Sequence, residues 1–200
     1  MRLLGIFRRE ILAFLDALAS ALPGRAGQFL RHGYYSLRLG RLGRMGARGT
    51  MAPGIQFFEP ENIFIGDDFN TLRGCVFAAP GGGRIELGNN VSFASNVVVD
   101  AGCEGVIRIG DNSGVAHNCV LRSSPHNYSD PSVPFKSQGH KPGSILIDED
   151  VWVAANCVLL PGTHIEKGCV VASGSIVGGL VKAYSIIAGN PARVIGRRGG

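Results

Sequence analysis

Aliphatic residues recur at every sixth position over most of the chain from residue 65 onward. Cut into sixes from Ile65, the sequence reads IGDDFN, TLRGCV and FAAPGG, and the same rhythm returns in three later runs. The first residue of a block is aliphatic or Phe at fourteen of fifteen positions, Thr71 being the exception; these positions are 65, 71, 77, 87, 93, 99, 109, 115, 121, 147, 153, 159, 165, 171 and 177. A period of six predicts short strands joined by tight corners.

Cysteines occupy a second fixed place in the same frame. Although the aliphatic residues set the frame, every cysteine falls at the fifth position of a block: Cys75, Cys103, Cys119, Cys157 and Cys169. A small side chain fits beside the inward aliphatic residue near a corner, and Asn and Gly at corners tolerate φ > 0. Three blocks close a triangular coil, and coils stack to bury their apolar edges. The pattern therefore predicts an all-β parallel solenoid with cysteines packed in its core.

The spacing between coils predicts where the chain leaves the solenoid. Coil starts at residues 65, 87 and 109 are 22 residues apart, which is a coil of 18 plus four, whereas 109 to 147 is 38 residues. The excess of twenty predicts one loop extruded from a corner, assigned to residues 122–144. This loop contains the polar, proline-bearing stretch SSPHNYSDPSVPFKSQGH and His126. A long loop on a rigid scaffold is a common place for function.

The first 48 residues form a separate segment by both pattern and charge. Apolar residues between 3 and 22 suggest an amphipathic helix that stops at Pro23–Gly24. Residues 1–48 hold nine Arg against Glu10 and Asp16, a net charge of +7, and residues 49–200 sum to −2. We therefore divide the chain into a basic helical segment, 1–48, and a β-helix domain, 49–200. The segment is expected to cap the open end of the solenoid or to lie on an anionic membrane surface.

Composition and charge exclude some classes of protein. A hydrophobic content of 45% allows a core, and 30 Gly among 200 residues suit many tight corners. Because the positive charge lies outside the β-helix domain, nucleic-acid binding is not expected. Arg8, Arg9, Glu10 and Asp16 interrupt the apolar start, which disfavours a signal peptide or a spanning helix. An odd number of cysteines at core positions suits a reducing compartment. The expected location is cytoplasmic, with peripheral contact to the inner membrane surface as a further expectation.

Four phrases of the sequence resemble a known family. They are the His-bearing loop ending in QG, ILIDEDVWVAANCVLLPG, CVVASGSIVGG and YSIIAGNPARVIG. Together with the repeat, which covers residues 60 to 197, they resemble the hexapeptide-repeat acyltransferases, whose fold is a left-handed parallel β-helix. The resemblance points to the branch of galactoside, maltose and xenobiotic acetyltransferases and the O-acetyltransferases of polysaccharide biosynthesis. It implies acetyl-CoA as co-substrate, no metal, and a homotrimer with active sites in the grooves between neighbouring solenoids.

The resemblance also implies site residues. His126 matches the catalytic histidine at the start of the loop, and the positions that contact acetyl-CoA correspond to Trp152, Ala155, Ser173, Gly178, Gly179 and Arg193. Asn96 and Asp100 are candidate acceptor ligands whose alternative role is at corners or in solvent. Several positions depart from the family pattern: Ala154 replaces a Gly, Ala155 lacks a polar side chain, and Gly178–Gly179 replaces a Thr-Lys pair. Acceptor-contacting positions of the galactoside enzymes fall on Ala94 and Gly102, which argues against a galactoside acceptor.

The chemistry of acetyl transfer assigns roles to these residues. A base must take the proton of the acceptor hydroxyl, and histidine suits this role near neutral pH. We expect His126 to deprotonate a sugar hydroxyl that attacks acetyl-CoA directly. The backbone N–H of Ala155 is expected to stabilise the oxyanion. Arg193 is expected to meet the phosphate or adenosine end of coenzyme A, and Ser173 its pantetheine arm. The predicted function is an acetyl-CoA-dependent O-acetyltransferase acting on a sugar of a polysaccharide precursor, nucleotide-linked or lipid-linked.

Other functions are compatible with parts of the pattern. An N-acetyltransferase of an amino sugar or antibiotic would use the same scaffold, and so would a non-catalytic solenoid tethered to a membrane. A zinc carbonic anhydrase needs three His ligands, whereas His117 and His126 are nine residues apart and the close-set histidine pattern is absent. His126 itself has an alternative role as a solvated loop residue. His117, His140 and His164 are expected to be structural or solvated.

Overall fold

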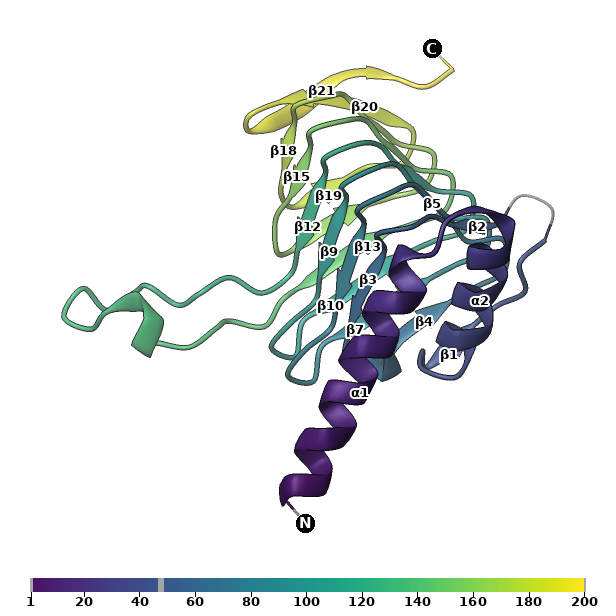
Figure 1. The fold of residues 1–200 in the computed structure, drawn as a ribbon. Coiled ribbons are helices and arrows are strands. Elements are labelled where there is room, and N and C mark those ends of the chain that lie inside the picture. Colours follow the sequence, from purple (N-terminus) through teal and green to yellow (C-terminus); the bar gives the residue numbers. More distant parts are fainter. Residues whose placement is uncertain (1, 47–48, 200) are drawn as a thin grey trace.

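A computed structural model describes residues 2–46 and 49–199 of the 200-residue chain. Two helices, α1 (Arg2–Ala21) and α2 (Gly24–Ser36), precede a long stack of short strands (Figure 1). The helices lie at one end of the stack, and the C-terminal hairpin closes the other end. In the described part of the chain, neither helix has a stretch long and apolar enough to cross a membrane.

The strands form three sheets that run along the sides of a triangular solenoid. The first sheet, sheet A, contains β1 (Arg41–Leu42), β4 (Ile63–Ile65), β7 (Arg84–Leu87), β10 (Val106–Ile109), β13 (Ser144–Ile147), β16 (Thr163–Ile165) and β19 (Leu180–Val181). Sheet B contains β2 (Thr50–Met51), β5 (Asn70–Thr71), β8 (Ser92–Phe93), β11 (Gly114–Val115), β14 (Trp152–Val153), β17 (Val170–Val171), β20 (Ser185–Gly189) and β21 (Ala192–Arg197). Sheet C contains β3 (Gln56–Phe58), β6 (Val76–Ala78), β9 (Val98–Asp100), β12 (Val120–Arg122), β15 (Val158–Leu159) and β18 (Ile176–Val177).

Each sheet pairs strands that are one coil apart. All these pairs are parallel except β20 with β21, which form an antiparallel hairpin. The chain visits sheets A, B and C in turn, so the described residues make six full coils and part of a seventh. The predicted fold class, a left-handed parallel β-helix with a helical N-terminal segment, is confirmed.

The core consists of the columns predicted from the period of six. One column in sheet A stacks Ile65, Leu87, Ile109, Ile147 and Ile165, and each of these side chains is buried. Thr71, the exception in the pattern, is also buried, and its hydroxyl accepts a hydrogen bond from the N–H of Ala52 at 3.3 Å. At the N-terminal end the core is aromatic: Phe77 and Phe93 meet edge to face with ring centroids 5.0 Å apart.

Extra residues are inserted at one corner of the triangle. The turns 79–83 and 101–105 account for the two insertions of four, and both lie between sheets C and A. The long loop, residues 123–143, leaves from the same corner between β12 and β13 and projects far from the solenoid (Figure 1). Its position agrees with the predicted loop 122–144.

Asparagine and cysteine connect successive coils at the corner between sheets B and C. Asn96, Asn118 and Asn156 adopt φ of about +60° and hydrogen-bond to one another through their side-chain amides. In the same corner the thiol of Cys119 donates to the carbonyl of Ala154 in the next coil at 3.1 Å.

Four of the five cysteines are core residues, as predicted. Cys75, Cys119, Cys157 and Cys169 are buried, and all five thiols are free. Burial raises the pKa of the Cys75 and Cys169 thiols, which keeps them neutral and unreactive. The prediction was wrong for Cys103. It is only partly buried and sits in the four-residue insertion with φ +54°, because the inserted turn pulls the fifth position out of the core.

The N-terminal helices cover the open end of the first coil. β1 pairs with β4, so the ladder already begins at Arg41, within the predicted segment 1–48. The buried Tyr35 of α2 packs against Phe57 with ring centroids 4.7 Å apart. This arrangement agrees with the expected role of the segment as a cap.

A buried arginine ties both helices to the first coil. The Arg31 guanidinium donates to the carbonyl oxygens of Met51 at 2.9 Å and Ala19 at 3.2 Å, and also to that of Leu22. One side chain therefore satisfies carbonyls at the end of α1 and on β2, and burial lowers its pKa. Gly27 lies against the Leu22 carbonyl, where a Cβ would overlap it.

Replacing Arg31 by Met should destabilise the protein by about 1–3 kcal/mol, because buried carbonyls lose their donor. Arg25→Met, at an exposed position of α2, should change stability by less than ~0.5 kcal/mol. Urea unfolding followed by circular dichroism measures both variants. Equal midpoints for the two variants would show that Arg31 does not hold the cap.

Candidate active site

The base of the long loop is packed into the corner between sheets C and A. Ser123 and Ser124, which follow β12, are buried, and the Ser123 N–H donates to the Asp100 carbonyl at 3.0 Å. The Ser123 hydroxyl is buried with no hydrogen-bond partner among the described residues. Gly105 in the coil below leaves just enough room for that hydroxyl, since a Cβ on Gly105 would overlap it. The corner thus fixes the point from which the loop departs.

His126 lies where the two arms of the loop meet. It forms an isolated antiparallel bridge with His140, flanked by hydrogen bonds from Asn127 N–H to Gly139 O and from Lys141 N–H to Pro125 O, both 2.9 Å. The two imidazole rings are stacked with centroids 4.0 Å apart and an interplanar angle of 35°. Phe135 approaches His126 edge to face at 5.3 Å.

Neither ring nitrogen of His126 has a hydrogen-bond partner among the described residues, and Nδ1 is also buried. A buried polar atom of this kind calls for an explanation, and sites of chemistry are one of the usual ones. The ring is therefore held by aromatic contacts and by the backbone bridge of its residue, with no hydrogen bond to its nitrogens from the described residues.

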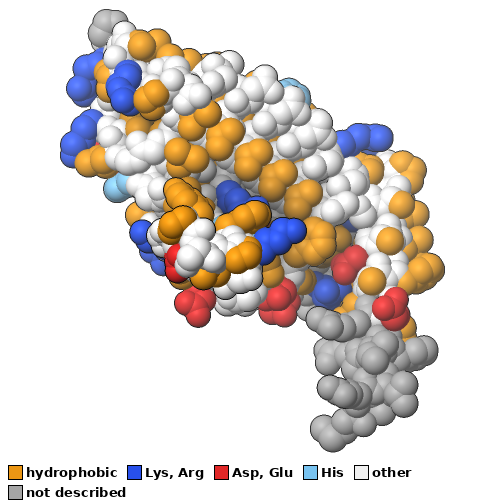
Figure 2. Space-filling view, turned by 90° about the vertical axis from the view of Figure 1, so that its left-hand side faces the viewer, with side chains coloured by type: hydrophobic (Ala, Val, Ile, Leu, Met, Phe, Trp, Pro, Cys, Tyr) orange, Lys and Arg blue, Asp and Glu red, His pale blue; other side chains and the backbone are white. Residues whose placement is uncertain are grey.

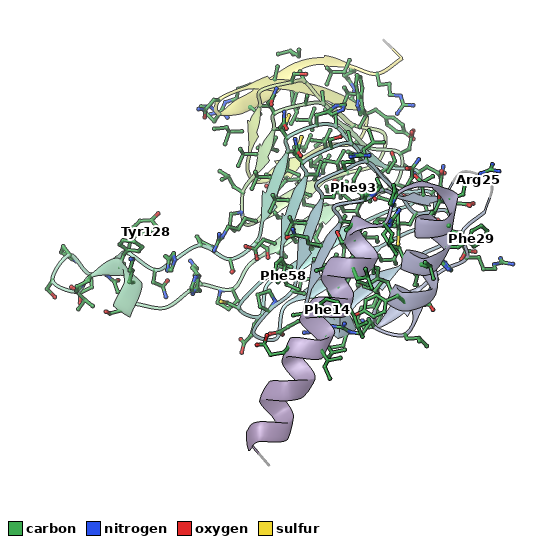
Figure 3. All side chains as sticks on the ribbon, in the orientation of Figure 1. Phe14, Arg25, Phe29, Phe58, Phe93 and Tyr128 are labelled. Carbon is green, nitrogen blue, oxygen red and sulfur yellow. The ribbon has the colours of Figure 1, made fainter. Side chains whose placement is uncertain are left out.

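The distal part of the loop is held by one amide side chain. Gln138 donates to the carbonyls of Asp130 and Val133 at 2.8 and 2.7 Å and accepts from the Asp130 N–H at 3.1 Å. Tyr128 is exposed far from the solenoid (Figure 3). The loop is thus an ordered hairpin-like arm, which keeps residue 140 opposite residue 126.

Asp100 joins the loop base to the outer face of sheet C. One carboxylate oxygen accepts the Gly102 N–H at 3.0 Å, and the other lies 3.5 Å from Nη1 of Arg122 on the neighbouring strand. Arg122 Nε in turn donates to the Ser124 carbonyl at 3.3 Å. Asp100 therefore lies beside the loop base that carries His126.

Gly178 and Gly179 lie at the same edge, two coils further on. They connect β18 to β19, both are exposed, and Gly179 has φ +75°. The Gly179 carbonyl accepts the His164 N–H at 2.9 Å. The corner between sheets C and A thus carries four predicted site residues: Asp100, His126, Gly178 and Gly179.

The other predicted residues lie on sheet B or at the corner between sheets B and C. Ala155 and Ser173 occupy that corner in successive coils, and the Ala155 carbonyl accepts the Gly174 N–H at 2.9 Å. Arg193 is exposed on β21, opposite Ala188 of β20, and the hairpin reaches this corner through the Gly189 N–H, which donates to Ser175. Asn96 belongs to the asparagine ladder at the same corner.

Trp152 covers a hollow on sheet B. Its ring is 56% exposed, and the hollow of about 490 Å³ lies between Asn90, Ser92, Gly114, Val170 and Arg198. Gly114 is the direct neighbour of Trp152 on the preceding strand, so the space beneath the indole is not filled by a side chain. The position suits contact with a flat or extended ligand.

A single chain keeps the two groups of residues apart. The strands of sheet C separate the two corners, and the extended path from Ala155 to Leu160 spans on the order of 15 Å. His126 and the predicted coenzyme A residues of the other corner therefore do not form one pocket within one chain.

Three residues near the loop base were not predicted as site residues: His140 and Phe135 contact His126, and Arg122 contacts Ser124. His140 was expected to be structural or solvated, and Phe135 and Arg122 were not considered. The sequence feature that could have indicated these residues is their position in or beside the non-periodic stretch 123–140. In the described residues, no group of three or more His, Cys, Asp and Glu is arranged to hold a metal ion.

Comparison with known sequences identifies relatives along most of the β-helix. The family profile described as bacterial transferase hexapeptide (six repeats) matches residues 144–179. A probable acetyltransferase of Mycobacterium tuberculosis is 32% identical over 136 residues, which is 68% of this chain and 42% of that protein. The putative lipopolysaccharide biosynthesis O-acetyl transferase WbbJ of Escherichia coli is 30% identical over 141 residues, 67% of this chain and 71% of that protein.

Solved structures share the fold. AntD, an N-acyltransferase from Bacillus cereus crystallised with dTDP-4-amino-4,6-dideoxyglucose and coenzyme A, superposes with a TM-score of 0.73 at 18% identity, covering 85% of this chain and 89% of that chain. A maltose O-acetyltransferase from Clostridium difficile gives a TM-score of 0.63 at 21% identity, covering 98% and 88%.

The close packing under the loop base can be tested with Gly105→Ala. The new methyl group would overlap the buried Ser123 hydroxyl and lies 3.0 Å from the Gly102 carbonyl, so we expect a loss of about 1–3 kcal/mol. Gly33→Ala, where a Cβ meets nothing within 4 Å in a helix, should be neutral or stabilising by up to ~1 kcal/mol. Calorimetry measures the melting temperatures of both variants. An unchanged melting temperature for Gly105→Ala would show that the loop base rearranges to accommodate the methyl group without loss of stability.

Proposed function

This chain belongs to the bacterial hexapeptide-repeat transferases, and we propose that it transfers an acetyl group from acetyl-CoA to a hydroxyl of a sugar. Family membership rests on the E. coli relative, of which the chain covers 71% at 30% identity. The observation that carries the mechanism is His126, partly buried at the loop base with an unpaired Nδ1.

His126 is the proposed general base. A neutral imidazole must offer a free lone pair to take a proton, and this ring has a nitrogen that no group of its own chain uses. The base removes the proton as the acceptor oxygen attacks the thioester carbon. The tetrahedral oxyanion then collapses, the C–S bond breaks, and the proton reaches the departing thiolate through the imidazolium. Such a base contributes about 10²–10⁴-fold.

His140 is proposed as a positioning residue for this base. It contacts His126 by ring stacking at 4.0 Å and shares the antiparallel bridge with it. Together with Phe135, which meets the imidazole edge to face, it restricts rotation of the His126 ring, since a ring in contact with two other rings has few open rotamers. A base that is already oriented loses less entropy when the acceptor arrives.

The donor site is proposed at the corner between sheets B and C. The Ala155 N–H makes no hydrogen bond in the described part of the chain, so it is free to donate to the oxyanion. Ser173 and Arg193 lie on the same side toward the C-terminal end, where pantetheine and phosphate groups would extend. Trp152 would pack its exposed ring against coenzyme A. Gly178 and Gly179, at the corner between sheets C and A of a neighbouring chain, would contribute backbone groups to the same coenzyme A site.

The acceptor pocket is proposed beside the base. Asp100 lies next to the loop base and keeps its carboxylate partly exposed beside Arg122. It is the preferred candidate for a hydrogen bond to a sugar hydroxyl. Asn96 remains a weaker candidate, because its amide is already used in the asparagine ladder.

We propose a homotrimer because the two corners must come from different chains to form one site. Sheet C offers a fitting surface: its outward positions form a column of aliphatic residues, Val76, Val98, Val120, Val158 and Ile176, stacked strand on strand. Figure 2, which looks onto this side of the molecule, shows hydrophobic side chains in rows across it. The equivalent outward positions of sheet A include Glu86 and Arg108, which pair with each other.

Placing a charge in the valine column should break the trimer. In Val120→Glu the carboxylate would be buried at the interface without a partner, which is strongly unfavourable. Leu146→Glu, at a partly buried outward position of sheet A, is the matched control and should leave the assembly intact. Light scattering after size exclusion should give a threefold lower mass for Val120→Glu alone. A monomeric wild type would contradict the shared-site proposal.

The catalytic assignment is tested by thiol release from acetyl-CoA with a panel of sugars, nucleotide sugars and amino sugars. His126→Ala should lower turnover by at least ~10². His140→Ala should lower it less and also alter the pH profile, because the base would no longer be held in one orientation. His164→Ala, whose ring pairs with Asp148 on sheet A, should behave as wild type.

Three outcomes would argue against these assignments. Turnover unaffected by His126→Ala would exclude that residue as the base. Preference for amino sugars would make the enzyme an N-acetyltransferase. If no acceptor is turned over and calorimetry detects no acetyl-CoA binding, the non-catalytic scaffold becomes the better explanation.

A further inference from the structure

In α2 and in residues 10–21 of α1, large apolar side chains point away from the solenoid. On α1 the exposed large side chains are spaced three and four residues apart, which places them on one face: Ile11, Phe14, Leu15 and Leu18. On α2 the exposed apolar side chains are Phe29 and Leu30, and Leu37 directly after the helix is exposed as well. Phe14, Phe29 and Leu37 are 68%, 78% and 87% exposed. A helix that caps a core normally shows the opposite arrangement, with its apolar face inward.

The inner face of α1 is small and polar. Ala19 is buried there, and the Ser20 hydroxyl donates to the Ile55 carbonyl at 2.9 Å. Asp16, on the same side, pairs with Arg38 of the following segment at 3.2 Å. Residues 10–21 of the helix are therefore fixed to the first coil by hydrogen bonds and an ion pair, and the large apolar side chains Ile11, Phe14, Leu15 and Leu18 remain exposed.

The inner face of α2 also lacks large aliphatic side chains. Gly27, Arg31 and Tyr35 are its buried residues, and the charged Arg31 serves the carbonyls of α1 and β2. The outward side of α2 carries Phe29, with Arg25 one turn earlier on its flank. Figure 3 shows Arg25 and Phe29 projecting from α2 away from the solenoid.

The same segment carries the positive charge of the chain. Residues 1–48 contain nine Arg and two acidic residues, whereas residues 49–200 have a net charge of −2. Of the two acids, Asp16 is already paired with Arg38. Arg25 and Arg41 are exposed and have no acidic partner among the described residues. Apolar side chains flanked by unpaired arginines meet the requirements of a surface that binds anionic lipid.

We propose that α1 and α2 form a docking surface for an anionic phospholipid bilayer. The side chains that would enter the region between headgroups and acyl chains are Ile11, Phe14, Leu15 and Leu18 from α1, Phe29 and Leu30 from α2, and Leu37 directly after α2. Arginines at the edges would lie among the phosphates. Figure 2 shows hydrophobic side chains along the outer edge of the described part of α1.

Charge favours a bilayer over a second copy of the same surface. Two segments of +7 brought face to face would repel each other, and no acidic cluster within residues 1–48 is available to compensate. An anionic lipid surface removes this repulsion, and each basic residue near it strengthens binding about fivefold. The inference stands on the helices alone and does not depend on the proposed acetyl transfer.

Vesicle flotation of the full-length protein tests the proposal. The wild type should float with vesicles of phosphatidylcholine and phosphatidylglycerol at about 7:3, and it should float much less with vesicles of phosphatidylcholine alone. About 0.5 M NaCl should release the protein from the anionic vesicles, because exposed charges are screened at that ionic strength. The double variant Phe14→Glu/Phe29→Glu should lower the partition coefficient at least ~10-fold, because both anchors become charged. Arg25→Glu should weaken binding to anionic vesicles selectively.

The matched control is Leu180→Glu, which removes an exposed leucine on sheet A, 54% accessible and far from the helices. It should float like the wild type. Circular dichroism and size exclusion verify that the double variant is folded, as expected for substitutions at exposed positions. Absence of wild-type flotation with the anionic vesicles would overturn the proposal. So would a fall in oligomeric mass caused by Phe14→Glu/Phe29→Glu without vesicles, since a second copy would then be the occupant.

Discussion

Everything in this protein depends on the stacking of successive coils in strict register. The N–H groups of one coil donate to the carbonyls of the next, for example Val98 to Cys119 and Val120 to Cys157, both at 2.9 Å. Because a shift of one residue would turn every inward side chain outward, the strands cannot absorb insertions. Extra residues are therefore found at corners, and the largest addition, the loop with His126, leaves from one of them. The proposed site of His126 at a corner agrees with this constraint.

The same constraint divides the candidate site. A rigid triangular coil holds its corners at fixed separation, so the proposed base at one corner cannot approach the proposed donor residues at another corner within one chain. Bringing the two groups of residues together requires a second solenoid beside the first. Sheet C, with its outward column of aliphatic residues, is the surface best suited to contact that second solenoid. In this arrangement assembly and catalysis are linked, since a chain on its own has each half of the site facing solvent.

Features that repeat with the coil were predictable, and features that depend on a single contact were not. The buried columns, the corner asparagines and the length of the loop follow from a period of six. Cys103 was misplaced because a four-residue turn breaks that period locally. The pairing of His126 with His140 could not be predicted, because it arises from backbone hydrogen bonds between residues 125–127 and 139–141 of a non-periodic loop. Arg31 gave no signal either, since an arginine in an amphipathic helix is normally assigned to the solvent face.

The orientation of the N-terminal helices shows why a pattern of apolar residues does not determine its own partner. Periodicity reveals that α1 has an apolar face, but whether this face turns inward depends on what the solenoid end offers. That end presents backbone groups: the carbonyls of Met51 and Ile55 accept hydrogen bonds from Arg31 and Ser20, and the Gly54 N–H donates to the Ser20 carbonyl. An unpaired buried carbonyl costs more than an exposed leucine, so the polar face is used for capping. The two roles expected of residues 1–48 are then compatible, because one side of the helices closes the solenoid and the other side remains apolar.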